Sequence, residues 1–453
     1  MARRPGQPTR ERRLQAISAW LGKPAALAAE QAAGETVQRI RTFSQATPDD
    51  LLAALDLLAG VAGAGIVVHG PRGCAAALAA AAGPWGVTGL DQRDTIMGSE
   101  GAVSRAVLSL HRRHRPWAIF VVATPVVAIN SDDARTAADE LSGELGIPVL
   151  AVRTDGFRSR VAATGYDTAC QALLALVPVT QDREDVVNLL AGDFSTATEA
   201  KALLDGLGVA VNVLPAGADA AAFARAARAR LSICLDLDVT GALGAGLEAA
   251  HGVPLLRGGV PIGLAATRRW LAAVAAATGH PEPGHLGTPD PGQTLGQTLA
   301  GRRVHLALPP DAGFAAAVLV TELGGTVSGL TLDHIDRTHA EALAAFTRTA
   351  PDAVLHVAAG QPFETANLLA SERPDLFVGT PEVAALAAAA GVPSVGVTPG
   401  ALTGRRGAEH LARRAAKALA NPGFVRRLAA APPPYAAGWL RRSADWHIKQ
   451  EVR

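Results

Sequence analysis

The chain has 453 residues, a formal net charge of +1 from 42 basic and 41 acidic side chains, and 4% aromatic residues. Its length exceeds one ordinary hydrophobic core, so two to four domains are expected. The balanced charge gives no argument for a nucleic acid or an acidic membrane as partner. The three cysteines are far apart and odd in number, which argues against a disulfide framework and favours a reducing compartment.

Residues 1–48 predict an N-terminal helical arm that lies over the main body or over a partner. Helical runs are expected at 10–21 and 24–40. The first residues are polar and lack the apolar region of a signal peptide. The apolar runs elsewhere are short and interrupted, so no membrane-spanning helix is predicted. Together these features predict a cytoplasmic protein without membrane insertion.

Residues 49–183 alternate apolar runs with amphipathic segments, which predicts a first βα domain. The expected strands are 65–68, 118–123 and 149–153, and the expected helices are 50–58, 75–82, 103–114, 134–145 and 166–176. Ser99 or Ser104 is expected to cap the helix at 103–114. The strand at 118–123 is apolar throughout, as expected for a parallel sheet buried on both faces.

The same alternation recurs twice, in a second βα domain at 184–298 and a third at 299–430. In the second domain the expected strands are 186–191, 209–214 and 231–237, and the expected helices are 196–207, 218–229 and 267–278. In the third, the expected strands are 304–308, 353–357, 376–378 and 394–397, with a helix at 312–323. Pro and Gly mark 281–297 as a linker. The repetition predicts an α/β protein of three doubly wound, Rossmann-like parallel-sheet domains.

Residues 431–453 form a C-terminal tail that is aromatic and basic. Two interpretations stay open for it: a helix packed on its own chain, or a segment that docks on a partner.

The chemically most distinctive stretch is His69-Gly70-Pro71-Arg72-Gly73-Cys74, which follows the strand at 65–68. Gly70 and Gly73 allow the backbone to approach a bulky group closely. A cysteine that opens a helix lies near backbone N–H groups, which are expected to favour the thiolate, the form that binds metal. The alternative is an ordinary strand–turn–helix corner with a small, partly buried cysteine.

Other motifs are lacking. The sequence has no Gly-x-Gly-x-x-Gly or P-loop pattern, no Gly-x-Ser-x-Gly elbow, and no Cys-x-x-Cys or His-Glu-x-x-His metal motif. Cys170 lies in a predicted helix and Cys234 in a predicted strand, so both are expected in the core. His69 is expected to make hydrogen bonds within the turn.

Several short motifs follow one another along the chain in an order that resembles a known protein family. After His69–Cys74 come Asp94-Thr95-Ile96-Met97-Gly98-Ser99-Glu100, Arg115–Thr124, Asn130-Ser131-Asp132-Asp133, Thr154-Asp155-Gly156-Phe157 and Val260-Pro261-Ile262-Gly263. Over residues 42–430 this order resembles the nitrogenase component 1 family. The resemblance implies the three-domain architecture of that family, which includes nitrogenase, its cofactor-assembly scaffold and the dark-operative protochlorophyllide reductases.

The resemblance also implies a role for Cys74. In nitrogenase each subunit supplies three cysteines to an eight-iron cluster, whereas here the segments 86–90 and 123–125 contain no thiol. In other members one cysteine at the Cys74 position completes a 4Fe–4S cluster whose other three ligands come from the partner subunit. Cys74 is therefore expected to be the metal ligand, with Gly70 and Gly73 lining the cofactor. Asp91 and Asp94 are either further oxygen ligands or surface carboxylates.

By the same resemblance the chain is expected to be a β-type subunit, because the cofactor-binding Cys and the late His of an α-type subunit cannot be placed in it. His356 and His410 lack the neighbouring residues expected around that histidine. An α-type partner, an α2β2 heterotetramer and an ATP-dependent iron-protein reductase are then expected. The first interpretation is a redox subunit that relays electrons to a site on the partner. The alternatives are a scaffold for assembling a nitrogenase-type metal cofactor, and a cluster-free binding or regulatory protein with the same fold.

Overall fold

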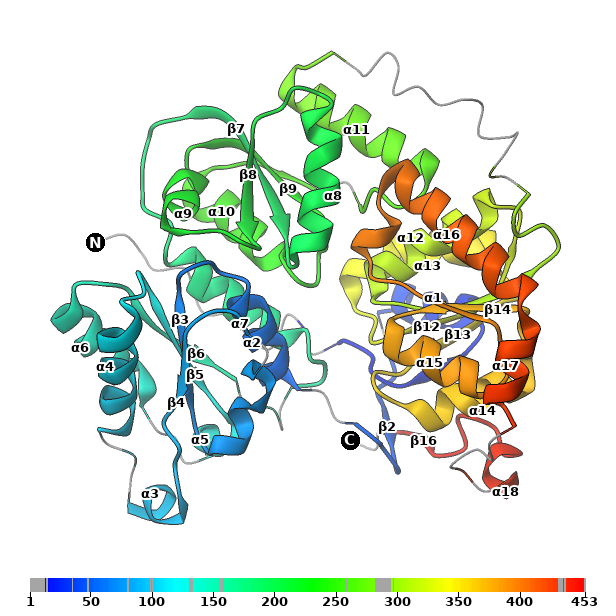
Figure 1. Cartoon of the computed structure of the whole chain (residues 1–453), viewed down its shortest axis with the longest axis horizontal. Coiled ribbons are helices and arrows are strands. Elements are labelled where there is room, and N and C mark those ends of the chain that lie inside the picture. Colours follow the sequence, from blue (N-terminus) through cyan, green and yellow to red (C-terminus); the bar gives the residue numbers. More distant parts are fainter. Residues whose placement is uncertain are drawn as a thin grey trace. The chain divides into compact units, whose positions relative to one another are not determined.

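The computed structural model divides into two compact units, Met1–Arg12 with Pro48–Gly258, and Arg13–Thr47 with Gly259–Arg453 (Figure 1). It describes residues 13, 15–34, 36–46, 49–79, 81–97, 99, 101–129, 133–154, 156, 159–257, 259–281, 295, 297–430, 435 and 437–451. No helix among these residues is both long and apolar enough to cross a membrane.

The first unit contains two four-stranded parallel sheets. One has the order β4-β3-β5-β6, from Trp85–Val87, Gly65–His69, Ile119–Ala123 and Val149–Arg153. The other has the order β10-β9-β7-β8, from Leu255–Leu256, Ala229–Cys234, Glu184–Ala191 and Val211–Pro215. Every residue of β3 and β5 is buried, which explains why their sequences show no polar alternation.

Helical segments connect these strands in the described part of the first unit. They are α2 (Asp50–Ala59), η2 (Arg72–Leu78), α3 (Gln92–Met97), α4 (Ala102–His114), α5 (Pro125–Ile129), α6 (Ala134–Leu145), α7 (Thr164–Leu174), α8 (Phe194–Asp205), α9 (Ala220–Ala226) and α10 (Gly241–His251). The helix expected at 75–82 is instead the 3₁₀ segment η2, which begins three residues earlier. Neither Ser99 nor Ser104 caps α4 with its side chain, because Gly101 is the N-cap residue.

The second unit is built on one six-stranded sheet of order β1-β13-β12-β11-β14-β15. The strands are Trp20–Gly22, Val354–Val357, Thr326–Leu332, Arg303–Ala307, Leu376–Gly379 and Ser394–Gly396. All pair in parallel except β1, which is antiparallel to β13. Its helices are α1 (Pro24–Ala32), α11 (Leu264–Thr278), α12 (Pro310–Glu322), η4 (Arg337–His339), α13 (Ala340–Thr349), α14 (Pro362–Glu372), α15 (Pro381–Ala389), η5 (Gly400–Leu402), α16 (Gly404–Ala420), α17 (Pro422–Leu428) and α18 (Ala437–Leu440). The fold is thus mixed α/β with several Rossmann-like parallel sheets, as expected.

The N-terminal region differs from the helical arm expected at 1–48. Its described part belongs to the second unit, where residues 20–22 are a strand and the helix that begins at Pro24 ends at Ala32. Ile17 and Trp20 are buried in the core of that unit. Pairing with β13 and burial of these two side chains outweigh the helical preference of the alanine-rich sequence.

Strand β12 was not expected from the sequence, although it lies near the middle of the six-stranded sheet. Gly329 interrupts its apolar pattern, and glycine is usually depleted in strands. The structure explains this glycine, because a Cβ at position 329 would overlap the imidazole of His305 on β11.

A buried ionic centre closes the second unit around Glu364 of α14. The carboxylate accepts hydrogen bonds from Arg41 (2.7 and 3.0 Å), from His356 Nε2 (2.9 Å) and from His447 Nε2 (2.8 Å). Burial alone would raise the pKa of Glu364, but the hydrogen bonds and charges of His356 and Arg41 lower it to about 2. The carboxylate therefore stays ionised, and Arg41 is not left as an uncompensated buried charge.

The C-terminal tail packs on its own chain, which is one of the two interpretations left open by the sequence. β16 (Ile448–Gln450) pairs with β2 (Arg39–Arg41) in an antiparallel ribbon. Asn367 Nδ2 donates to the carbonyls of Leu440 and Arg442. The expected linker at 281–297 falls largely outside the described residues, as do Pro432, Pro433 and Pro434.

Candidate functional site

Cys74 lies at the carboxyl edge of the first sheet, on the 3₁₀ segment η2 that follows β3. Its backbone N–H donates to the Pro71 carbonyl at 3.1 Å, and its side chain is half-buried against the hydrophobic core. The ends of parallel strands meet at such an edge, where α/β proteins bind their ligands. The turn thus holds a partly accessible sulfur where a ligand is expected.

The two glycines of the turn have different surroundings. A Cβ on Gly70 would overlap the side chain of Thr124, which follows β5, so the turn packs directly against the neighbouring strand end. A Cβ on Gly73 would meet nothing within 4 Å. Gly70 is therefore required by packing, whereas the space beside Gly73 and Cys74 is open and available to a ligand.

The electrostatic environment of Cys74 differs from the one expected. Burial, and then the charge of Asp49, raise the pKa of the Cys74 thiol. The carboxylate of Asp49 caps α2 by accepting from the Leu52 N–H at 3.1 Å, which fixes it near the sulfur. The turn alone does not favour the thiolate, so the expectation drawn from the helix terminus was wrong; a bound metal cation would have to supply that stabilisation.

Polar side chains follow the neighbouring strand ends. His69 is completely buried, with Nδ1 3.2 Å from Thr88 Oγ1 and Nε2 3.4 Å from Ser99 Oγ. The Thr88 hydroxyl also accepts from the Gly70 N–H at 2.9 Å. The expectation that His69 makes hydrogen bonds around the turn is confirmed, and it is not free to act as a ligand.

Thr124 is an exception among the polar side chains at these strand ends. Its hydroxyl is buried and has no hydrogen-bond partner among the described residues. A buried hydroxyl without a partner costs free energy, so a native structure usually offers it one. It therefore marks a place at the edge where a missing group could bind. In the sequence, Thr124 stands out only as part of a segment without a thiol. Burial without a hydrogen-bond partner cannot be seen in a sequence.

The two aspartates and the other two cysteines have structural surroundings. Asp91 and Asp94 lie at the start of α3 and accept each other's backbone N–H groups at 2.9 and 3.1 Å. Backbone hydrogen bonds lower the pKa of the exposed Asp91, which identifies a surface cap. Cys170 and Cys234 are buried, as expected, and their sulfurs lie 3.2 Å from the carbonyls of Val239 and Asp236.

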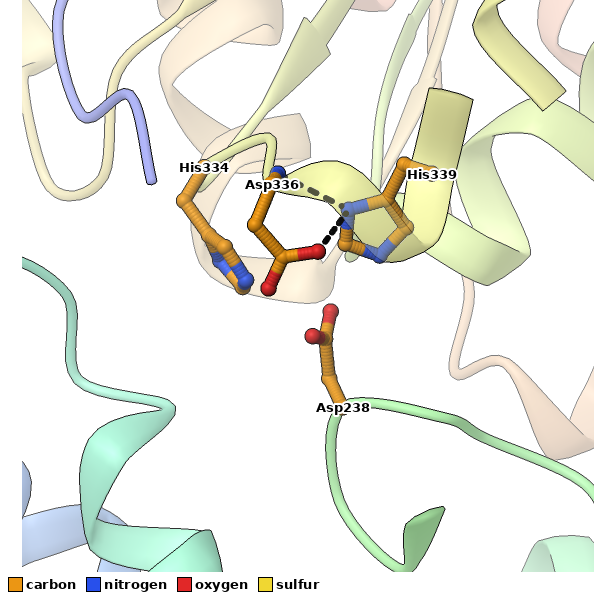
Figure 2. Close-up of side chains that lie close together, drawn as sticks. All are labelled: Asp238, His334, Asp336 and His339. Atoms are coloured by element: carbon orange, nitrogen blue, oxygen red, sulfur yellow. Dashed lines mark hydrogen bonds and ion pairs between the residues drawn. The ribbon is translucent and has the colours of Figure 1, made fainter. Parts of the chain in front are cut away.

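A second group of titratable side chains follows β12 in the second unit. The ligand atoms of His334, Asp336 and His339 lie within 4.8 Å of one another (Figure 2). The guanidinium of Arg13 already contacts this group, 2.7 Å from Asp336 Oδ2 and 3.4 Å from His334 Nε2. In addition, the Asp336 N–H donates to His339 Nδ1 at 3.1 Å in a capping box, so the neutral ring carries its proton on Nε2. These contacts indicate a structural cluster rather than a metal centre.

The donor set at the Cys74 edge has a defined chemical capacity. Among the described residues it offers one thiol, one buried hydroxyl without a partner and an open approach past Gly73. Four thiolates are the usual requirement of a 4Fe–4S cluster. The edge therefore fits one corner of a cluster shared with another chain and does not fit a self-contained one.

Comparison with known proteins identifies a matching family model and several similar proteins. Residues 51–420 match the family model described as nitrogenase component 1 type oxidoreductase. The chain is 28% identical over 240 residues to the nitrogenase iron-molybdenum cofactor biosynthesis protein NifE of Methanococcus maripaludis, covering 48% of each chain. It is 30% identical over 257 residues to one subunit of the light-independent protochlorophyllide reductase of Acidiphilium rubrum, covering 52% of this chain and 50% of that protein.

The matched segment spans about half the length of these relatives. Among solved structures, the chain is similar to one titled nitrogenase Cp1 at pH 6.5, with a TM-score of 0.73 and 17% identity over 84% of this chain and 94% of that one. At this identity the structural likeness supports the fold alone.

Proposed function

Because this chain belongs to the nitrogenase component 1 type oxidoreductase family, we propose that it is a scaffold subunit in the assembly of a nitrogenase-type metal cofactor. The observation that supports the proposal most directly is the half-buried Cys74 at an open sheet edge, where a single sulfur can complete a cluster held mainly by a partner. Several relatives of this chain are biosynthesis proteins for the iron-molybdenum cofactor.

The same edge is suited to an α-type partner subunit. Leu52 on the first turn of α2 is 51% exposed, and Ile129 at the end of α5 is 67% exposed. Large apolar side chains left exposed in this way are typical of surfaces that another protein covers. A partner on this surface would bring the remaining cluster ligands to Cys74 and exclude water from the cluster. The αβ pair is expected to dimerise to a heterotetramer.

In this arrangement a shared 4Fe–4S cluster would either transfer single electrons or serve as a precursor of the metal cofactor. Cys74 would hold it through Sγ, Gly73 leaves room for it, and the Thr124 hydroxyl lies buried at the neighbouring strand end. Deprotonation of Cys74 accompanies binding, since a metal ligand must be the thiolate. No acid–base group of this chain is required for holding the cluster.

A second candidate is a subunit of a substrate-reducing complex that receives electrons from an ATP-dependent iron-protein reductase. The similarity to a protochlorophyllide reductase favours this candidate. The two differ in outcome: a scaffold gives its cluster to an acceptor protein, whereas a reductase subunit keeps its cluster and turns over a small substrate.

The test is anaerobic co-purification of the chain with a co-expressed α-type homologue, followed by iron and sulfide analysis and EPR. We expect a 4Fe–4S signal in the wild-type complex. Cys74→Ala should lower the iron content or convert the signal to a three-iron type, while the complex remains assembled. Cys170→Ala is the matched control, because its buried sulfur should not affect iron.

Transfer of radiolabelled iron to a cofactor-free nitrogenase component supports the scaffold. Retention of iron with reduction of a small substrate supports the second candidate. An iron-free reconstituted complex contradicts both and leaves the cluster-free binding protein. An unchanged spectrum and iron content in Cys74→Ala shows that Cys74 is not a ligand.

A further inference from the structure

A stripe of basic side chains runs along α16 in the second unit. Ala408, Leu411, Ala412 and Ala415 face the core, which fixes the orientation of the helix. On the other side Arg406, His410, Arg413 and Lys417 follow one another at intervals of four, three and four residues. At about 1.5 Å per residue this stripe is about 16 Å long. It is therefore a one-sided surface whose positive charges come from Arg406, Arg413 and Lys417.

Most of these charges lack a counterion within the described part of the chain. Glu409 is the single acidic residue between 404 and 428, and it pairs with Arg405 at 2.7 Å. None of the described residues forms an ion pair with Arg406, Arg413, Lys417, Arg426 or Arg427. Helix α11, which packs against α16, adds the exposed Arg268 and Arg269. Burial, and then the charges of Arg414 and Arg413, lower the pKa of His410.

Apolar side chains are exposed on α17, the helix that directly follows α16. Phe424 and Leu428 of α17 are 59% and 39% exposed, while Val425 between them is buried. With about 100° between successive residues, Phe424 and Leu428 share one flank of α17, and Arg426 and Arg427 lie on the remaining exposed side. Leu386 of α15, which packs against α17, is also exposed. The surface thus combines a cationic stripe with two or three apolar anchors.

The net charge of the whole chain conceals this feature. Residues 48–258 contain 23 acidic and 16 basic residues, whereas residues 404–428 contain one acidic and seven basic residues. We propose that the basic face of α16 and α17, formed by Arg406, Arg413, Lys417, Arg426 and Arg427, binds the anionic headgroups of a lipid bilayer, with Phe424 and Leu428 inserted at its margin.

The grouping of the side chains favours lipid over other polyanions. Clusters of four to eight basic residues are attracted to anionic leaflets by about 1 kcal/mol each. Apolar side chains beside them add binding by entering the interface. Single-stranded nucleic acids would call for aromatic side chains distributed along the stripe, but the exposed aromatic side chain of this surface, Phe424, is at one end. The result is reversible, peripheral binding.

The test is co-sedimentation of the full chain with vesicles of phosphatidylglycerol and phosphatidylcholine, compared with vesicles of phosphatidylcholine alone. We expect binding to the anionic vesicles only, lost at high salt because surface charges are then screened. Reversal of two charges in Arg413→Glu/Arg427→Glu should lower the partition coefficient at least tenfold. Phe424→Ser should lower it several-fold at low salt, since it removes an apolar side chain that enters the interface.

The matched control is Arg112→Glu/Arg113→Glu at the end of α4, which makes the same charge change on two exposed arginines of the first unit. The proposal is overturned by equal binding to both vesicle types, by equal losses in the control and the test variant, or by no binding. Binding of duplex DNA or of poly-glutamate at the same salt in the absence of vesicle binding would also overturn it. None of these readouts involves iron, so the outcome is independent of the proposed function.

Discussion

The Glu364 centre of the second unit and the Cys74 edge of the first unit are opposite solutions to burying polar groups. At Glu364, three partners from β2, β13 and the C-terminal tail saturate one carboxylate that is 1% exposed. At the other edge, Cys74 is half-exposed and the Thr124 hydroxyl is buried without a partner among the described residues. A saturated network stabilises a fold, whereas an unsaturated edge is what a ligand or a partner requires.

The largest expected effect follows from breaking the saturated centre. Glu364→Ala should destabilise the chain by about 3–5 kcal/mol, because Arg41 would remain as a buried, uncompensated charge. Urea unfolding measures this, and limited proteolysis should show the tail released near residue 447. Glu382→Ala on the exposed start of α15 is the control and should change stability by about 0.5 kcal/mol or less. A Glu364→Ala variant as stable as the control would show that the centre is not a stabilising one.

The pH dependence of this centre gives the next effect. The folded pKa of Glu364 is about 2, below its ordinary value of 4.5. The carboxylate therefore contributes stability above pH 4.5, which is lost as pH falls from 4.5 towards 2. The loss amounts to about 3 kcal/mol. The stability difference between the wild type and Glu364→Gln should shrink over this pH interval, as followed by urea titrations. A difference that stays constant would contradict the assigned pKa.

A smaller effect separates the two buried cysteines from the half-buried Cys74. Cys170→Ser and Cys234→Ser should each cost about 1–3 kcal/mol, because both sulfurs are packed in the core. Cys74→Ala should cost less than either, since its side chain is half-exposed. Thermal unfolding of the three iron-free variants checks this order. A Cys74→Ala variant that is the least stable would identify Cys74 as a core residue.

The smallest effect concerns Thr124. Thr124→Val should leave the stability of the iron-free chain unchanged or raise it by up to about 1 kcal/mol, because the substitution removes a hydroxyl that is buried without a described partner. Thr240→Val is the matched comparison, and it should be destabilising because Thr240 Oγ1 donates to the Asp236 carbonyl at 3.1 Å. Equal losses in both variants would show that the Thr124 hydroxyl is bonded in solution.

The sequence predicted the parts of the fold that depend on local pattern. Strands such as β5 and β6 were placed within one residue, because apolar runs and the helices between them are local features. Strand β12 was missed, since Gly329 is explained only by His305 on another strand. The N-terminal strand was taken for helix because its pairing partner, β13, lies more than 300 residues away.

The candidate site was predictable to a similar degree. The position of Cys74 after a strand and a glycine turn was predicted from the sequence, and the structure confirms it. The charge of Asp49 near the sulfur and the unbonded Thr124 hydroxyl were not, because both arise from tertiary packing. The Glu364 centre was missed for the same reason, as Arg41 and Glu364 are 323 residues apart in sequence.

The ribbon of β2 and β16 has a consequence for synthesis on the ribosome. Residues 48–258 include every described residue of the first unit, and their strands pair among themselves, so this part can fold while the rest of the chain is still being made. Residues 39–41 are translated before this unit, but their pairing partner at 448–450 is translated after it. The segment at 39–41 must therefore wait until all of the intervening chain has been made before it can pair. Co-translational folding of this chain is thus expected to proceed from the middle of the sequence outwards.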